Sequence, residues 1–167
     1  MLRSVITGLA IVFAIAVAVP GAAAATGLST AYAVAGIETS IPTNNTSTFA
    51  GAAVGSSGDA AVWKASVVHQ ALSNCPFGSN TSCAITGGSF SLTNSGGVHL
   101  TGSFTDGSVT PVAQQPACGK QIFGVAGALA TTSGPAVFNA TLTHYRTFLF
   151  GTCITYFAKI TGLVQLK

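Results

Sequence analysis

Residues 144–157, HYRTFLFGTCITYF, hold the densest group of reactive side chains in a chain in which only 5% of residues are charged. An imidazole and a guanidinium two positions apart on a β-strand point to the same face, so His144 and Arg146 would lie side by side. At one side of an apolar cavity, such a pair can fix an anionic or polar group of a ligand. The reactive residues of this stretch are His144, Tyr145, Arg146, Cys153 and Tyr156.

The stretch predicts a β-hairpin, and its hydrophobic pattern selects a register. A two-residue loop at 151–152 would set the apolar side of one strand beside the polar side of the other. A three-residue loop at 151–153 removes this mismatch and pairs His144 with Ile160. This register puts Cys153 at the tip of the loop. It predicts an inward direction for Leu142, His144, Arg146, Phe148 and Tyr156.

Alternation along residues 59–71 adds two residues to the predicted interior. Trp63 and His69 share one face of this segment, whereas Lys64 and Gln70 share the other. The apolar neighbours of Trp63 mark its face as the buried one. We therefore expect His69 to point inward, beside Trp63.

A buried Arg146 needs a partner, because an unpaired charge is costly to remove from water. Three carboxylates are available, Glu38, Asp59 and Asp106, and of these Glu38 lies on a predicted strand. In the structural interpretation, Arg146 reaches the rim and pairs with Glu38 or a backbone carbonyl, and the inward histidines are satisfied core residues. In the functional interpretation these groups bind a ligand. The candidate ligand-binding residues are Trp63, His69, His144, Arg146, Tyr156 and Glu38.

The start of the chain predicts a secretory signal peptide. A positive charge at Arg3 precedes an apolar run at 5–19, and the small residues at 22–25 offer two overlapping cleavage patterns. We expect a cleaved signal at 1–25; the alternative is an uncleaved membrane anchor. Residues 26–167, about 142 in number, then form one domain, and the protein is secreted.

The remaining chain predicts an all-β fold. Segments rich in Val, Ile, Thr and Phe alternate with clusters of Gly, Ser, Asn and Pro. Short connections favour antiparallel pairing of neighbours, and a meander of about eight strands can close into a barrel. The alternative is a two-sheet β-sandwich. The predicted strands are 30–40, 46–54, 59–71, 84–93, 97–105, 118–130, 136–150 and 154–166, with a short extended piece at 107–113.

The four cysteines predict two disulfides, since an even number in an exported chain is typical of disulfide bonding. Four cysteines allow three pairings. We expect Cys75–Cys83, which closes a short polar loop, and Cys118–Cys153, which the meander brings to the same end of the domain. With no C-x-x-C motif in the chain, we expect no metal site and no cofactor.

Several classes of function are disfavoured by composition. The net charge of +3 is scattered rather than gathered in a stripe, which argues against nucleic-acid binding. The mixed face of residues 155–165 argues against a membrane-spanning barrel. With three acids and no G-x-S-x-G or H-E-x-x-H motif, a hydrolase has no positive support.

Two functions therefore remain. The first is a structural or surface-associated module without catalytic activity, for which association with the cell surface is a natural role. The second is a barrel that binds a small apolar or anionic ligand, with lipocalin-like or avidin-like architecture, although no diagnostic motif of either family occurs. In that barrel Trp63, Phe90, Phe148 and Tyr156 would form apolar walls around His144 and Arg146.

Overall fold

The computed structural model describes residues 27–40, 45–70, 81–112, 116 and 118–167. The predicted signal peptide and Cys75 lie outside these residues. In the described part the secondary structure consists of eight strands, and no helix is long and apolar enough to cross a membrane. The strands are β1 (Ala31–Glu38), β2 (Thr46–Gly55), β3 (Ala60–His69), β4 (Cys83–Asn94), β5 (His99–Pro111), β6 (Gly119–Thr131), β7 (Gly134–Leu149) and β8 (Thr152–Leu166).

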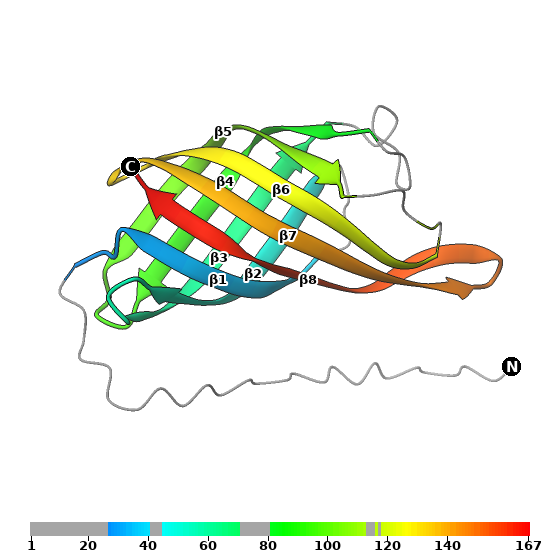
Figure 1. Cartoon of the computed structure of the whole chain (residues 1–167), viewed down its shortest axis with the longest axis horizontal. Coiled ribbons are helices and arrows are strands. Elements are labelled where there is room, and N and C mark those ends of the chain that lie inside the picture. The colour runs from blue at the N-terminus through cyan, green and yellow to red at the C-terminus, as the bar shows by residue number, and fades with distance from the viewer. Residues whose placement is uncertain (1–26, 41–44, 71–80, 113–115, 117) are drawn as a thin grey trace, which may run out of the picture.

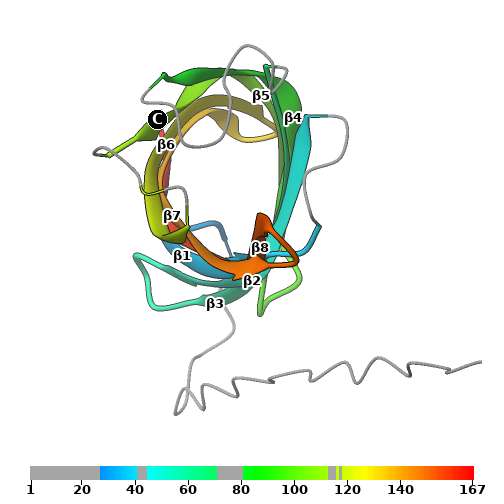
Figure 2. The same cartoon turned by 90° about the vertical axis from the view of Figure 1, so that its right-hand side faces the viewer.

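The eight described strands form a closed antiparallel barrel (Figures 1 and 2). Each strand pairs with the next along the chain, and β8 pairs with β1 to close the sheet, as in Ala33 opposite Leu163. The predicted meander and its closure are confirmed. The sandwich alternative is wrong, because a single sheet runs through every strand without an edge.

Residues 97–105 and 107–113, predicted as separate pieces, are joined in the single strand β5. Between these two pieces lies a β-bulge: Phe104 pairs with Leu129 and Asp106 with Ala128, so Thr105 is left without a partner on β6. Gly107 has a φ of 153°, and a Cβ there would come within 2.3 Å of the Ala126 carbonyl oxygen. A glycine is therefore required by close packing against β6 rather than by a change of chain direction.

Aromatic side chains fill the middle of the barrel. Trp63 of β3 is 1% exposed, and its indole ring lies 6.4 Å from the ring of Phe90 and 6.2 Å from that of Phe138, centroid to centroid. The indole lies against Gly36, where a Cβ would be 2.9 Å from it, and its Nε1 donates a hydrogen bond to the Ala35 carbonyl oxygen at 3.1 Å. The bare backbone of Gly36 thus makes room for the largest side chain of the core.

The two ends of the barrel differ in their polar residues. At one end, here called the Asp59 end, Asp59 is 2% exposed and accepts hydrogen bonds from Ser29, Ser57 (2.9 Å) and Tyr32 (3.1 Å). Burial raises the pKa of Asp59, but these hydrogen bonds outweigh it and hold the pKa below its usual value. The cluster ties residues 27–30 to this end. The opposite end, here called the hairpin end, carries the turn between β7 and β8.

The register of the β7–β8 hairpin differs from the prediction. Leu149 pairs with Thr152 around a two-residue turn, Phe150-Gly151, whose φ angles of 49° and 78° are both positive, as in a type I′ turn. A β-bulge then inserts Tyr156 as an unpaired residue. The predicted three-residue loop is therefore wrong. The predicted partners on β8 are displaced by two residues on the barrel side of the bulge and by three residues nearer the turn.

The bulge explains why the faces of the hairpin were predicted better than its pairing. Leu142 lies opposite Ile160 and His144 opposite Ala158, and all four side chains are buried. With a two-residue turn alone, inward-facing positions of β7 would pair with outward-facing positions of β8. The extra residue in β8 brings the inward-facing positions of the two strands opposite each other again. Between the bulge and the turn, the side chains that were predicted to point inward no longer do so. Tyr156 is 65% exposed and Phe148 is 69% exposed, so both were wrongly predicted to line the interior.

Candidate functional site

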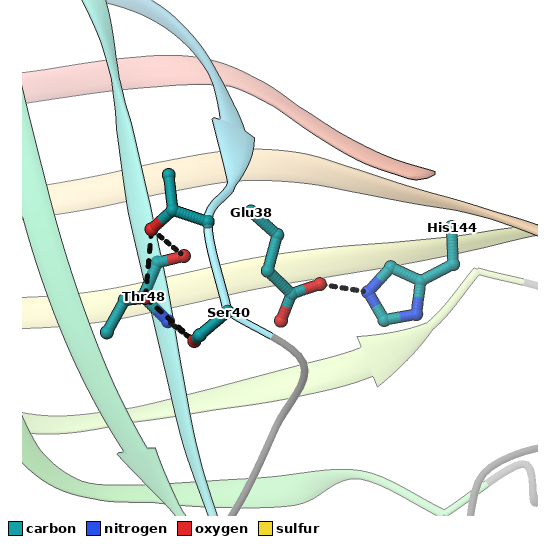
Figure 3. Close-up of polar contacts among 5 residues, drawn as sticks. Glu38, Ser40, Thr48 and His144 are labelled. Carbon is teal, nitrogen blue, oxygen red and sulfur yellow. Dashed lines mark hydrogen bonds and ion pairs between the residues drawn. The ribbon is translucent and has the colours of Figure 1, made fainter. Parts of the chain in front are cut away.

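A pocket of about 420 Å³ opens at the hairpin end, in the seam between β1 and β8. The β1–β8 ladder stops at Ile37 opposite Lys159. Beyond it β1 turns toward β2, where the Thr39 backbone N–H donates to the Thr48 carbonyl oxygen at 2.7 Å and the Ser40 hydroxyl bonds to Thr48 (Figure 3). The seam therefore opens toward solvent. The pocket is lined by Glu38, Thr39, Ser40, His144, Arg146, Cys153, Ile154, Thr155, Tyr156, Phe157 and Ala158.

A buried ion pair forms the inner wall of this pocket. Glu38, the last residue of β1, places Oε2 3.1 Å from Nε2 of His144 on β7, and both side chains are 5% exposed (Figure 3). The second carboxylate oxygen of Glu38, Oε1, is buried and accepts no hydrogen bond from the described residues. An unsatisfied buried acceptor is costly, so this oxygen is suited to receive a donor from a molecule in the pocket.

Two residues of β6, Phe123 and Gln121, lie beside His144. Phe123 packs against it with ring centroids 5.4 Å apart at 60°. Gln121, directly opposite His144 in the ladder, is 0% exposed and donates from Nε2 to the Pro116 carbonyl oxygen at 2.8 Å. Gln121 is not among the predicted site residues, although its alternation with Phe123 and Val125 indicates a place inside the barrel.

Arg146 lies at the rim and donates from Nη2 to the Cys153 carbonyl oxygen at 2.8 Å. This agrees with the structural interpretation, in which Arg146 reaches the rim and bonds to a backbone carbonyl. Glu38, the other predicted partner, is paired with His144 instead. The guanidinium therefore braces the two strands of the hairpin against each other.

The predicted ligand-binding residues are only partly brought together. Glu38, His144, Arg146 and Tyr156 line the pocket, with Tyr156 at its exposed edge. Trp63 is sealed in the core. His69 is half-buried at the end of β3, and six residues of strand separate it from Trp63, about 20 Å. The expectation that His69 lies beside Trp63 is therefore wrong.

The predicted disulfide between Cys118 and Cys153 is confirmed, with the Cα atoms 5.7 Å apart. Cys118 directly precedes β6 and Cys153 lies in the second position of β8. The bond therefore ties the outer part of the hairpin to the barrel at the rim of the pocket. Cys83 is also disulfide-bonded, whereas its predicted partner Cys75 lies outside the described residues.

The chemistry available here is that of a carboxylate and an imidazole. Among the described residues no group of three His, Cys, Asp or Glu side chains could hold a metal ion. The arrangement suits hydrogen bonding to a bound molecule, or stabilisation of the seam where β1 leaves β8.

Comparison with known proteins gives no relative for this chain: no family model, curated protein or solved structure matches it.

Proposed function

We propose that this chain is an exported structural module, in which a rigid, disulfide-stabilised barrel serves as a scaffold at or outside the cell surface. The observation that carries the proposal is the contact between Trp63 and Phe138. Their ring centroids lie 6.2 Å apart although β3 and β7 stand on opposite sides of the eight-stranded barrel. Small barrels either fill with side chains or hold a ligand, and this contact favours the first.

The cysteines support export. Cys118 and Cys153 are bonded to each other, and Cys83 is also oxidised. Disulfides form and persist in oxidising compartments and are rare in reducing ones. The predicted signal peptide at 1–25 is consistent with that compartment.

The sole tryptophan makes the proposal testable. Trp63 emission would be followed while the oxidised protein is titrated with apolar and anionic probes such as palmitate and anilinonaphthalene sulfonate. A scaffold with a filled interior gives unchanged Trp63 emission at every probe concentration. A saturable change in emission would mean that a ligand reaches the core, and would overturn the proposal. The intact mass would test export, with an expected chain start near Thr26.

A second candidate function has its own observation in Glu38 Oε1, which is buried at the pocket wall without a donor from the described residues. A small polar ligand with a hydrogen-bond donor could satisfy it there. Native mass spectrometry of the protein purified from its host would reveal such a ligand as added mass. In this candidate function, Glu38→Gln reduces the added mass, whereas the control Thr161→Val, on the exposed outer wall, retains it.

A further inference from the structure

The outer part of the β7–β8 hairpin, residues 147–154 and here called the hairpin tip, carries an exposed apolar surface. Phe150 at the turn is 96% exposed and Phe148 is 69% exposed. Leu149 (45%) and Ile154 (38%) lie between and beside them, and Tyr156 (65%) lies just behind. Soluble domains seldom gather so many large apolar side chains at one projecting point, which marks the tip as an interaction surface.

The hairpin tip extends beyond the rest of the barrel. The β6–β7 ladder ends at Gly119 opposite Arg146, and the β1–β8 ladder ends at Ile37 opposite Lys159. In the described ladders, residues 147–149 pair with β8 alone. Figure 1 shows this end of the hairpin projecting past the neighbouring strands. The disulfide from Cys153 to Cys118 and the hydrogen bond from Arg146 hold the projection in place.

Phe150 is not the residue that the turn itself prefers. Its φ of 49° lies in the left-handed region, which a bulky side chain seldom adopts. Type I′ turns favour Asn at this position, followed by Gly as found at Gly151. The phenyl ring thus adds backbone strain and exposed apolar area without a contact that would benefit the fold.

Charge around the hairpin tip has one sign. Between Arg146 and Lys159 the chain contains no Asp, Glu, Lys, Arg or His. Lys159 and Lys120 are exposed on the barrel wall behind the tip, and Lys159 lies 6.0 Å from the Tyr145 ring centroid. Two of the three acids of the chain are buried, Glu38 in its ion pair and Asp59 at the opposite end.

We propose that the hairpin tip inserts into the interface of an anionic lipid bilayer. Phe148 and Phe150 would occupy the boundary between headgroups and acyl chains, where aromatic rings partition well. Lys120 and Lys159 would lie near the lipid phosphates, and each basic residue near an anionic surface adds to binding. We favour a lipid surface over a protein groove for two reasons. The hairpin tip projects beyond the barrel and carries no charged residue, and lysines are exposed on the barrel wall behind it. This inference is independent of the proposed scaffold function.

Vesicle co-sedimentation of the full oxidised protein tests the proposal. Wild-type protein is expected to bind vesicles of phosphatidylcholine with about 30% phosphatidylglycerol, and to bind pure phosphatidylcholine more weakly. Phe150→Asn should weaken binding about tenfold, from the apolar burial lost with one phenyl ring. Because Asn suits the left-handed turn, its melting temperature should not fall, which separates lost binding from lost folding. The control Val62→Thr makes an exposed apolar side chain on the barrel wall more polar (Val62 is 62% exposed) and should bind like wild type.

Any one of four outcomes would overturn the proposal. The first is failure of the wild-type protein to sediment with either vesicle, and the second is binding of Phe150→Asn as strong as that of the wild type. The third is equal binding of the wild type to neutral and anionic vesicles, with the same binding in Lys120→Ser/Lys159→Ser, which would show that the lysines do not contribute. A wild-type dimer that Phe150→Asn dissociates, together with absent vesicle binding, would assign the tip to a second copy of the chain.

Discussion

Trp63 and Phe138 reach toward each other from opposite walls of the barrel, with ring centroids 6.2 Å apart. Phe138 also lies 5.9 Å from Phe104 and 6.4 Å from Phe90, centroid to centroid, and is 1% exposed. One ring on β7 thus contacts side chains from β3, β4 and β5. The barrel is held together across its interior as well as around its wall.

Phe138→Ala is expected to lower the free energy of unfolding by about 3–5 kcal/mol, because it leaves a cavity among rings that cannot easily collapse. Urea denaturation followed by Trp63 emission would measure the change. Phe148→Ala is the matched control, since this ring is 69% exposed, and it should change stability by less than about 0.5 kcal/mol. Equal losses in the two variants would contradict a filled interior.

The ion pair between Glu38 and His144 predicts strong coupling. Removing either partner takes this contact away from a buried polar side chain, so Glu38→Leu and His144→Leu should each cost about 3 kcal/mol. The double variant should be more stable than the sum of the two losses implies, by about 1–3 kcal/mol. Thermal or urea unfolding of the four proteins completes the cycle. Additive losses would mean that the contact contributes no stability of its own.

Period-two alternation was sufficient to predict the barrel and much of its interior. A strand with one buried face must alternate, so Trp63, Leu142 and His144 could be placed inside from the pattern alone. All three are buried. Closure also followed from sequence, because a meander with short connections leaves two edges that can pair. The same reasoning would have found Gln121.

Positions at which the backbone departs from the ladder could not be predicted in this way. A phenylalanine in a left-handed turn, as at Phe150, has no recognisable sequence signal, so the loop was placed one residue too late. The bulge at Tyr156 then changed the partners of β8 without changing the faces nearer the barrel. The pairing of Glu38 with His144 rather than with Arg146 depended on that register. For the candidate site, the sequence thus predicted which strand face carries His144, but it did not predict which side chain His144 contacts.

The Cys118–Cys153 disulfide, with a sequence separation of 35, is expected to contribute about 4 kcal/mol in the chain-entropy treatment. Cys118→Ser should lower the guanidinium midpoint accordingly. Cys118→Ser/Cys153→Ser should be no less stable than the single variant, since both have lost the same cross-link. A single variant as stable as wild type would show that strain in the native bond offsets its effect on the unfolded chain.

Asp59 predicts a loss of stability in acid. Burial opposes its ionisation, but hydrogen bonds from Ser29, Ser57 and Tyr32 outweigh it, so the folded pKa lies below the unfolded value near 3.8. A depressed folded pKa gives stability that is fully present above the unfolded pKa and is lost as pH falls through the folded value.

The free energy of unfolding, measured by urea between pH 7 and pH 2, should therefore decline below about pH 4 in the wild type. Asp59→Asn should be less stable at pH 7 and should decline less in acid, because its side chain cannot titrate. Asp106→Asn removes an exposed carboxylate of the same type and serves as the control for lost charge. If Asp59→Asn followed the wild-type acid profile at a constant offset, the stabilisation of the Asp59 carboxylate at this end of the barrel would be refuted.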